Sequence, residues 1–498
     1  YYNSATSALA SAQLVASRIE AKTPAELQTL STFTNWNFNL IWQLNAASFP
    51  NLLFNRSPGT FYVSPTGDDS NPGTEVLPWK TMTLAGSEAI AGDTIIFRGG
   101  VYSDRLVILN SGESSNKIIF KNYTGETPII SPSPLPVADE YGLVEAINVS
   151  NIEVNGLELT GVVLNSATKV PIGVHVSGRG ENIDLKNLKI HGIENNNANG
   201  NAHGILVAGT EPIPLKNINI ENNEIYNLNL GWSESLVLNG NVDTFLIKNN
   251  IVRDNNNIGI DIIGLEGTCS TCTQELDRAR NGVVSFNTIS NITSATNASY
   301  GGDLGAVGIY VDGGKDVVIE NNSVTTSDFG IELASELQNQ SFYVDNVIVR
   351  NNLIYNNKMA GLATGGYTAT RKGCRNCTIV HNTFYKNNTA ADSIGEFYIQ
   401  HNALDTIVQN NIFYAGTEGI FINMEGTGNS GFDFNGNLYY TEVTPMKWRW
   451  NATNYASFAT FKTGSSAEAQ GLYADPLFIN AALIDFSLQN TSPAKDAG

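Results

Sequence analysis

Acidic side chains recur in three short segments that read GIDIIG (259–264), GIYVDG (308–313) and GIELAS (330–335). Alternate residues of a β-strand point to opposite faces, so Ile260 and Ile262 should face a core while Asp261 faces out. The same rule turns Tyr310, Asp312 and Glu332 outward. If the segments stack in register about 4.8 Å apart, these side chains form one outward acidic patch.

Two kinds of chemistry suit such a patch. Carboxylate oxygens at short range could hold Ca²⁺, with Asp261, Asp312 and Glu332 as ligands. Alternatively, Asp261 and Glu332 lie two coils apart, about 9–10 Å by strand spacing, and could act as general acid and base of an inverting glycosidase. The remaining alternative is a solvated acidic face.

Long insertions follow or precede these segments, at 265–282, 293–306 and 363–377. Loops on a rigid scaffold often carry binding residues, so we expect them to wall a groove over the patch. The candidate substrate-binding residues are Asn239, Arg278, Arg280, Tyr300, Tyr310, Tyr367, Arg371 and Lys372. Lysines and arginines that could serve as a catalytic base are Lys315, Lys358, Arg280, Arg371 and Lys372. His203 is the best catalytic candidate among the histidines, and Tyr398, Gln400 and Glu425 could extend the patch.

All four cysteines lie in these loops, as Cys269-Ser-Thr-Cys272 and Cys374-Arg-Asn-Cys377. Two such pairs could form a four-thiolate zinc site. For an extracellular chain disulfides are favoured over zinc. The bonds could be local or could join the two loops.

The segments belong to a repeat that dominates residues 217–414. An alternating apolar strand, a polar step ending in Asn and a second apolar strand recur, and the last Asn of each step is Asn223, Asn250, Asn287, Asn322, Asn352, Asn382 and Asn411. The gaps are 27, 37, 35, 30, 30 and 29 residues, a period typical of solenoids. Three strands per repeat predict an all-β, single-stranded parallel β-helix. The Asn side chains should form a hydrogen-bonded ladder along its axis.

The flanking sequences differ from the repeat. Residues 1–57 predict a helical extension at 7–33 followed by an aromatic segment. Residues 58–440 predict the β-helix, with a short helix at 78–90 that plugs its open end. Residues 441–498 predict an irregular cap and a last rung. Lys447, Trp448, Arg449 and Trp450 there could cap the coil or bind a sugar.

Two stretches carry a resemblance to a known superfamily. YVSPTGDDSNPGT and PWKTMTLAGSEAIAGDTIIFRGGVY near the start, with YADPLFIN and DFSLQNTSPAKDAG near the end, resemble secreted right-handed β-helix proteins that act on polysaccharides, including family 9 pectate lyases. The resemblance spans about residues 60–498. It implies a right-handed coil and secretion, and in the lyases of this superfamily Ca²⁺ binds a uronate while Lys or Arg acts as base.

The totals exclude some partners. The 498 residues carry 47 Asp and Glu against 28 Lys and Arg, a net charge of −19. Such a charge argues against nucleic acid and anionic membranes as partners. No apolar run is long enough to span a bilayer. The sequence thus predicts a secreted polysaccharide-cleaving lyase or hydrolase. The alternative is a non-enzymatic extracellular β-helix that assembles through residues 1–57.

Overall fold

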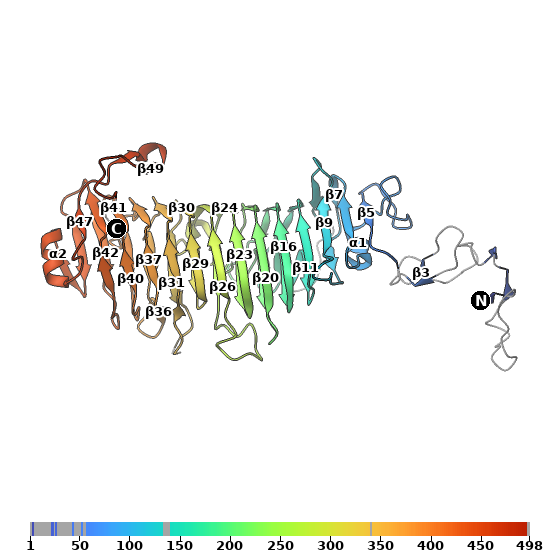
Figure 1. Ribbon diagram of the computed structural model, residues 1–498, viewed down its shortest axis with the longest axis horizontal. Helices are drawn as coiled ribbons and strands as arrows, with labels where there is room; N and C mark the ends of the chain where they lie inside the picture. Colours follow the sequence, from blue (N-terminus) through green and yellow to red (C-terminus); the bar gives the residue numbers. More distant parts are fainter. Residues whose placement is uncertain are drawn as a thin grey trace.

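The computed structural model describes residues 56–132, 140–338 and 341–495, together with short stretches of the first 55 residues. These residues form one long coil of short parallel strands, running from the blue end to the red end of Figure 1. The predicted helical extension lies largely outside the described residues. Of the segment predicted to be helical, Ala21–Lys22 is a short strand.

Each turn of the coil contributes one strand to each of three faces. In one turn, β19 (His203–Gly209), β20 (Leu215–Glu221) and β21 (Glu224–Tyr226) follow one another, and β22 (Leu236–Gly240) then returns to pair in parallel with β19. We call the face that contains β19 and β22 the site face. Its later strands are β25 (Ile260–Ile263), β28 (Val307–Asp312), β31 (Phe329–Ser335), β35 (Leu362–Thr364), β39 (Phe397–Ile399), β42 (Ile420–Met424) and β45 (Lys447–Trp450). The parallel β-helix predicted from the repeat is confirmed.

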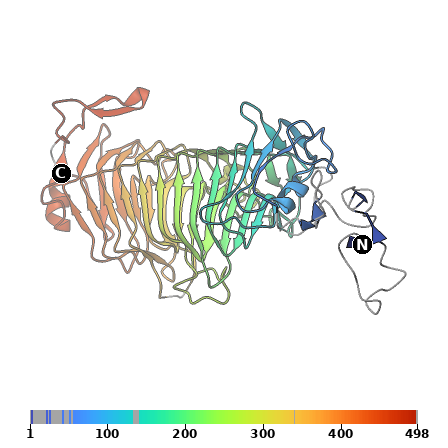
Figure 2. The same cartoon turned by 45° about the vertical axis from the view of Figure 1, so that its right-hand side comes forward.

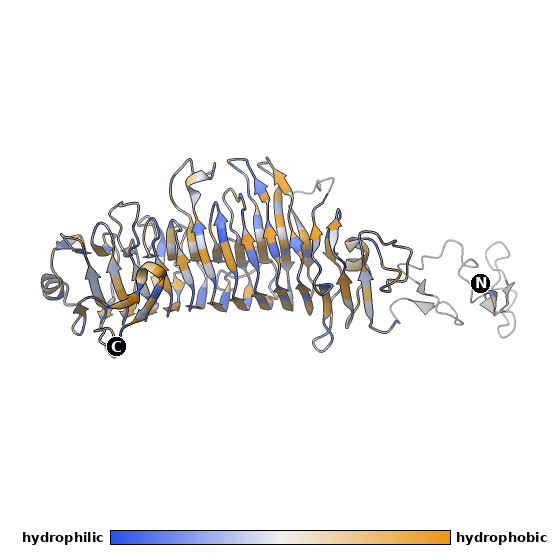
Figure 3. Ribbon diagram, turned by 90° about the horizontal axis from the view of Figure 1, so that it is seen from above, coloured by the Kyte–Doolittle hydropathy of each residue, from blue (hydrophilic) through white to orange (hydrophobic). Residues whose placement is uncertain are grey.

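The strands direct alternate side chains into the core and away from it. Ile260, Ile262, Ile309 and Val311 are fully buried, as the alternation predicts. Figure 3 shows hydrophobic and hydrophilic bands that alternate along the strands in the middle of the coil. The outward residues of β25 and β28, such as Asp261 and Tyr310, are also buried, although they point away from the core.

The Asn ladder is also confirmed. Asn287 Nδ2 donates to Asn322 Oδ1 at 2.9 Å, and Asn322 Nδ2 donates to Asn352 Oδ1 at 3.0 Å. The ladder runs from Asn223 to Asn437, where it ends on the buried carboxyl group of Glu468. The residue before most ladder positions, such as Asn321 with a φ of 56°, is left-handed. Asn tolerates that conformation well, which explains the repeated Asn-Asn pairs.

Helices close both ends of the coil. The predicted N-terminal plug is α1 (Met82–Glu88), whose Met82, Ala85 and Gly86 are buried. At the other end, α2 (Phe458–Ser465) packs Phe461 against Trp448. The coil continues through β45, which pairs in parallel with β42. The hairpin of β48 (Phe478–Asn480) and β49 (Asp485–Leu488) then folds back along the coil (Figure 2). No helix in the described ranges has the length and apolarity needed to cross a membrane.

Candidate active site

Asp261, Tyr310 and Glu332 lie in one row across the site face. Asp261 is in register with Tyr310, and Tyr310 is in register with Glu332. All three point away from the core, because their neighbours in the strands are the buried Ile and Val residues. Tyr310 therefore separates the two carboxyl groups of Asp261 and Glu332.

Asp312 occupies the neighbouring row rather than the same one. It lies two residues beyond Tyr310 in β28 and is in register with Ala334. The backbone N–H of Glu336 donates to Asp312 Oδ1 at 2.8 Å. This bond fixes the chain after β31 so that Glu336 borders the acidic patch.

On the N-terminal side of Asp261, Glu234 and His203 form a close pair. His203 Nδ1 lies 3.4 Å from Glu234 Oε2, and each side chain is only 12% exposed. Burial and then the charge of His175 lower the pKa of His203 to about 3. Burial and then the charges of Glu266 and Glu336 raise the pKa of Glu234 to about 8. Both groups are therefore neutral at pH 7.

The loop after β25 brings a further carboxylate to the patch. Asn239 Nδ2 donates to Glu266 Oε2 at 3.0 Å, and Thr268 Oγ1 donates to Asn239 Oδ1 at 2.7 Å. Asp277 accepts the backbone N–H groups of Gly267 and Cys269 and so closes the loop. The loop is thus a fixed wall that holds Glu266 beside the row.

The loop at 293–306 forms a second wall. Asn297 Nδ2 donates to the carbonyl oxygens of Gly231 and Asn256, which ties the loop to the turn before β22. The rings of Trp232 and Tyr300 come within 5.1 Å of each other there, and Trp232 is 51% exposed. An aromatic pair, with Trp232 exposed and Tyr300 half-buried, therefore lies at the rim of the acidic patch.

Burial under these loops changes the protonation of the patch. It raises the pKa of Asp261 well above its usual range, with further contributions from Glu234, Asp312, Glu266 and Glu336. Burial and then Glu336 raise the pKa of Glu332 to about 8. Burial is also the main cause that raises the pKa of Asp312. Carboxyl groups this close cannot all ionise, so the patch retains protons at neutral pH.

One atom in the patch lacks a partner. Asp261 is 2% exposed, and its Oδ1 is buried without a hydrogen bond within the described part of the chain. A buried oxygen that accepts nothing costs free energy, because it has lost its water without replacement. Such an atom indicates a place where a ligand or a water molecule completes the site.

The residues do not fit a calcium site in this arrangement. Across the described ranges, no group of three or more His, Cys, Asp and Glu side chains is arranged to hold a metal ion. Tyr310 stands between Asp261 and Glu332, and burial favours their protonated forms. Ca²⁺ requires several close oxygen ligands, preferably ionised, so the set expected from the sequence is not preformed.

Comparisons with known proteins agree with this fold. A family model described as Pel9A-like, right handed beta helix region matches residues 61–229, and a right handed beta helix region model matches residues 241–395 and 276–441. Over 436 residues the chain is 38% identical to YwoF of Bacillus subtilis, covering 87% of this chain and 92% of YwoF. The chain belongs to the right-handed β-helix family.

Two further likenesses are narrower. Pectate lyase PEL9 of Emericella nidulans is 39% identical over 93 residues, which is 18% of this β-helix protein and 22% of PEL9. A GH136 lacto-N-biosidase from Eubacterium ramulus shares the fold with a TM-score of 0.50 at 16% identity, covering 77% of this chain and 64% of that chain. The resemblance read from the two ends of the sequence is thus confirmed for the β-helix fold.

Several predicted site residues of this β-helix lie elsewhere. Arg278 is buried and donates to the carbonyl oxygens of Gly313 and Gly314, while Arg280 binds Asn241 and Asp243. Both guanidinium groups are committed to closing loops, so their prediction as substrate-binding residues or bases is not supported. Lys315 pairs with Glu275 and Asp316, and Lys358 pairs with Asp328. These lysines are likewise held by structural carboxylates.

The remaining predicted basic residues lie at the rim. Arg371 Nε donates to the Glu336 carbonyl oxygen, and its guanidinium lies 3.9 Å from the ring centre of the exposed Tyr367. The charge of Arg371 opposes the rise in the Glu336 pKa. Lys372 lies over the ring of Tyr343 instead. The cysteines form two local disulfides, Cys269–Cys272 and Cys374–Cys377, rather than a bond between the loops.

Glu234, Glu266 and Trp232 belong to the site but were not predicted from the sequence. Glu234 precedes its strand, and Glu266 follows one, so neither belongs to an alternating pattern. One signal was available for Glu234, because the repeat places it one rung from His203, which the analysis did single out. No pattern could place Glu266, since its position depends on how the loop folds back onto Asn239.

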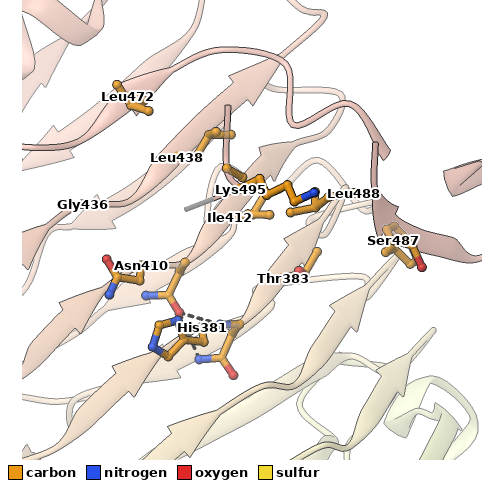
Figure 4. Close-up of a pocket in the computed structure, with 14 residues that line it drawn as sticks. His381, Thr383, Asn410, Ile412, Gly436, Leu438, Leu472, Ser487, Leu488 and Lys495 are labelled. Atoms are coloured by element: carbon orange, nitrogen blue, oxygen red, sulfur yellow. Dashed lines mark hydrogen bonds between the residues drawn. The ribbon is translucent and has the colours of Figure 1, made fainter. Parts of the chain in front are cut away.

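A separate cavity lies far from these acids, between the C-terminal hairpin and the coil. It has a volume of about 530 Å³ and is lined by His381, Thr383, Asn410, Leu438 and Lys495, among others (Figure 4). The dashed hydrogen bonds in Figure 4 belong to the Asn ladder behind it. None of the described residues that line the cavity carries a carboxyl group, so they offer no acid and base pair.

Proposed function

We propose that this protein cleaves a glycan by hydrolysis, with Asp261 and Glu332 as the general base and the general acid. The observation that carries the proposal is the buried, unpartnered Oδ1 of Asp261, which lies in one row with a carboxyl group two rungs away. Two rungs correspond to about 9–10 Å of backbone. Inverting glycosidases use carboxyl groups about 6.5–9.5 Å apart, with a water molecule between substrate and base.

The raised pKa of Glu332 supports its role as the acid. Glu332, with a pKa of about 8, is protonated at neutral pH and can donate to the leaving oxygen. Asp261 has a free acceptor atom where the attacking water would donate its hydrogen bond. As the base, Asp261 acts in its ionised form, which burial disfavours and which is reached only as the pH rises; it then takes a proton from that water. The reaction then yields a new reducing end, with one water consumed per bond.

The rim supplies surfaces for a sugar chain. Trp232 and Tyr300 offer aromatic faces on one side, and Tyr367 with Arg371 offers a second aromatic face on the other. Aromatic rings bury the apolar faces of pyranose rings while leaving the hydroxyl groups free. The patch itself is acidic and largely protonated, which suits a neutral glycan better than a polyanion.

A lyase is the second candidate, because the likeness to pectate lyase PEL9 favours it. Elimination from a uronate needs cations to bind the carboxylate and a base to remove the α-proton. The Pel9A-like match ends at residue 229, before Glu234 and the carboxyl groups of the patch. Arg371 is the one predicted base that borders the patch, and it is the residue on which a lyase mechanism would depend.

We also propose that the protein works outside the cell. The two disulfides are consistent with an oxidising compartment. A glycan polymer as substrate would be met there.

Digestion of a polysaccharide panel tests the proposal. The panel contains xylan, arabinan, galactan, β-glucan and polygalacturonate, each with and without EDTA, and is read by reducing ends and by absorbance near 235 nm. Hydrolysis predicts reducing ends without absorbance and without an effect of EDTA. A rise in absorbance would overturn hydrolysis in favour of the lyase, and no cleavage of any polymer would overturn both.

Substitution then assigns the residues. Asp261→Asn and Glu332→Gln keep the shape of the side chains but remove the acid–base function, so turnover should fall by about 10²–10⁴ fold. Asp433→Asn, at an exposed position on another face of the coil, is the matched control and should retain full activity. If Asp261→Asn folds normally and retains its turnover, the assignment is wrong.

A further inference from the structure

A second cavity lies on the site face, near the C-terminal end of the coil. It has a volume of about 350 Å³ and is bounded by β42, β45 and β46 (Thr453–Tyr455). Its lining includes Asn423, Met446, Lys447, Arg449 and Tyr455. None of these residues belongs to the acidic patch.

The segment Lys447-Trp448-Arg449-Trp450 divides its side chains between the core and this cavity. Trp448 is fully buried and stacks on Phe421 and Phe461, and Trp450 packs against Phe434. Lys447 and Arg449, at the alternate positions, line the cavity. The two roles considered for this segment from sequence are therefore split: the Trp residues close the coil, and the cations face outward.

Asn423 supplies the observation that points to a ligand. It is 4% exposed, its Nδ2 donates to the Ser393 carbonyl oxygen at 2.9 Å, and its Oδ1 is buried without a donor among the residues described. Because Asn423 lines the cavity, the missing donor would have to come from what fills it. A buried amide oxygen without a donor is costly, and a hydroxyl group of a ligand would complete it.

The two cationic side chains that line the cavity with Asn423 differ in their interactions. Arg449 is held by Glu425, whose other oxygen accepts the Tyr398 hydroxyl at 2.6 Å. Lys447 is exposed, and across the described ranges it has no ion pair. The cavity thus presents one fixed and one free cationic donor beside an unfilled acceptor, which matches the mixed hydrogen-bonding character of a sugar ring.

The cavity lies on the same row as the proposed catalytic residues. From Glu332 the register passes through Ala363 and Tyr398 to Asn423 and Arg449. Six rungs separate Asp261 from Arg449, which corresponds to about 29 Å along the coil. A glycan chain that is cleaved at Asp261 and follows the row would therefore reach Asn423 after several sugars.

We propose that the cavity around Asn423 and Lys447 is a distal sugar subsite of the same groove, which binds a ring of a neutral glycan several sugars away from the cleaved bond. This inference rests on the proposed function for its substrate. A ring hydroxyl donates to Asn423 Oδ1, and other ring oxygens accept from Lys447 and Arg449. The subsite gives the protein a preference for polymers over short oligosaccharides.

Binding is measured by native gel electrophoresis with xylan, arabinan, galactan or β-glucan cast into the gel. At least one polymer should retard the protein. Asn423→Leu combined with Lys447→Ala should weaken that retardation about tenfold in apparent affinity, since two hydrogen bonds are lost. Lys447→Ala alone changes only an exposed side chain and should reduce affinity severalfold. Lys216→Ala is the matched control, because Lys216 is an exposed lysine of β20, outside the site face.

Two results would overturn the subsite: no retardation by any polymer, or equal retardation of the wild type and of both variants. Retention without cleavage by the wild type would remove the proposed hydrolysis and leave the subsite in place. Cleavage by the wild type, with retardation of the variants equal to that of the wild type, would remove the subsite and leave the proposed hydrolysis in place. On a cleaved polymer the variants should raise KM and leave kcat unchanged. On a trisaccharide of the same sugar, too short to reach Asn423, both constants should equal those of the wild type.

Discussion

At the scale of single residues, burial sets the charge of the site. Asp261, Asp312 and Glu332 face away from the core, yet the loops cover them, and their pKa values rise because the charged forms lose water. The same burial leaves Asp261 Oδ1 without a partner. A side chain that costs stability in this way is expected where a function depends on it.

The raised pKa of Glu332 makes the free energy of unfolding depend on pH in a predictable direction. The folded protein keeps the Glu332 proton up to a pKa of about 8, whereas the unfolded chain releases it near 4.5. Between these values the folded state holds the Glu332 proton and the unfolded chain does not, so the contribution of Glu332 to stability is greatest at acid pH and falls as the pH rises toward 8. Glu332 alone contributes a slope of up to about 1.4 kcal/mol per pH unit in that window.

Urea unfolding of Glu332→Gln between pH 5 and 8 tests this argument. The variant should lose stability less steeply than the wild type as the pH rises, because Gln releases no proton. Glu113→Gln, at an exposed position, should follow the wild-type slope. Parallel slopes for wild type and Glu332→Gln would show that Glu332 titrates normally in the folded protein.

These residues also show what the sequence could and could not predict. Asp261, Tyr310 and Glu332 could be placed in one row because a period of two and a repeated Gly fix both side and register. Asp312 was expected in the same patch, and the register places it one row away. Glu266 could not be predicted, because a loop that is closed by Asp277 and Asn239 has no period.

At the scale of elements, the corners depend on the Asn ladder. Asn322 is 2% exposed, donates to the Val284 carbonyl oxygen and to Asn352 Oδ1, and accepts from the backbone and side chain of Asn287. Removing the amide leaves buried donors and acceptors of two neighbouring rungs without partners. The ladder is therefore a structural element, as the sequence predicted, and not part of the site.

Asn322→Ala should lower the free energy of unfolding by about 3 kcal/mol, since unsatisfied buried polar groups cost about 1–3 kcal/mol each. Asn199→Ala is the matched control, because Asn199 is exposed and its side chain forms no hydrogen bond in the described structure. Chemical denaturation of both variants measures the difference. A loss for Asn322→Ala no larger than that for Asn199→Ala would mean that the ladder adds nothing to stability.

At the scale of the whole molecule, the repeat determines the architecture and the departures from it determine the site. A coil of stacked rungs gains stability rung by rung, so its length follows from the number of repeats. The sequence predicted the coil as far as residue 440, whereas β45 has no Asn step and could not be recognised from the period. The acidic patch lies where three long insertions leave the regular rung. Their residues are visible in the sequence, but their contacts are not.

The N-terminal end of the coil is closed by residues from Arg56 onward. Arg56 Nη1 donates to the fully buried Asp93 at 2.8 Å and Nη2 donates to the Glu88 carbonyl oxygen at 2.8 Å, while α1 covers the first rungs.

Residues 1–55 should therefore be dispensable for folding. Their deletion should leave the thermal unfolding midpoint within about 1 °C of the wild type, which is about 1 kcal/mol for a protein of this size. Arg56→Ala should instead cost about 3 kcal/mol, because it leaves the buried Asp93 carboxylate without its cation. Calorimetry of the two proteins separates the contributions. A large loss on deletion would assign residues 1–55 to the fold, and a change in sedimentation without a loss of stability would support their proposed role in self-assembly.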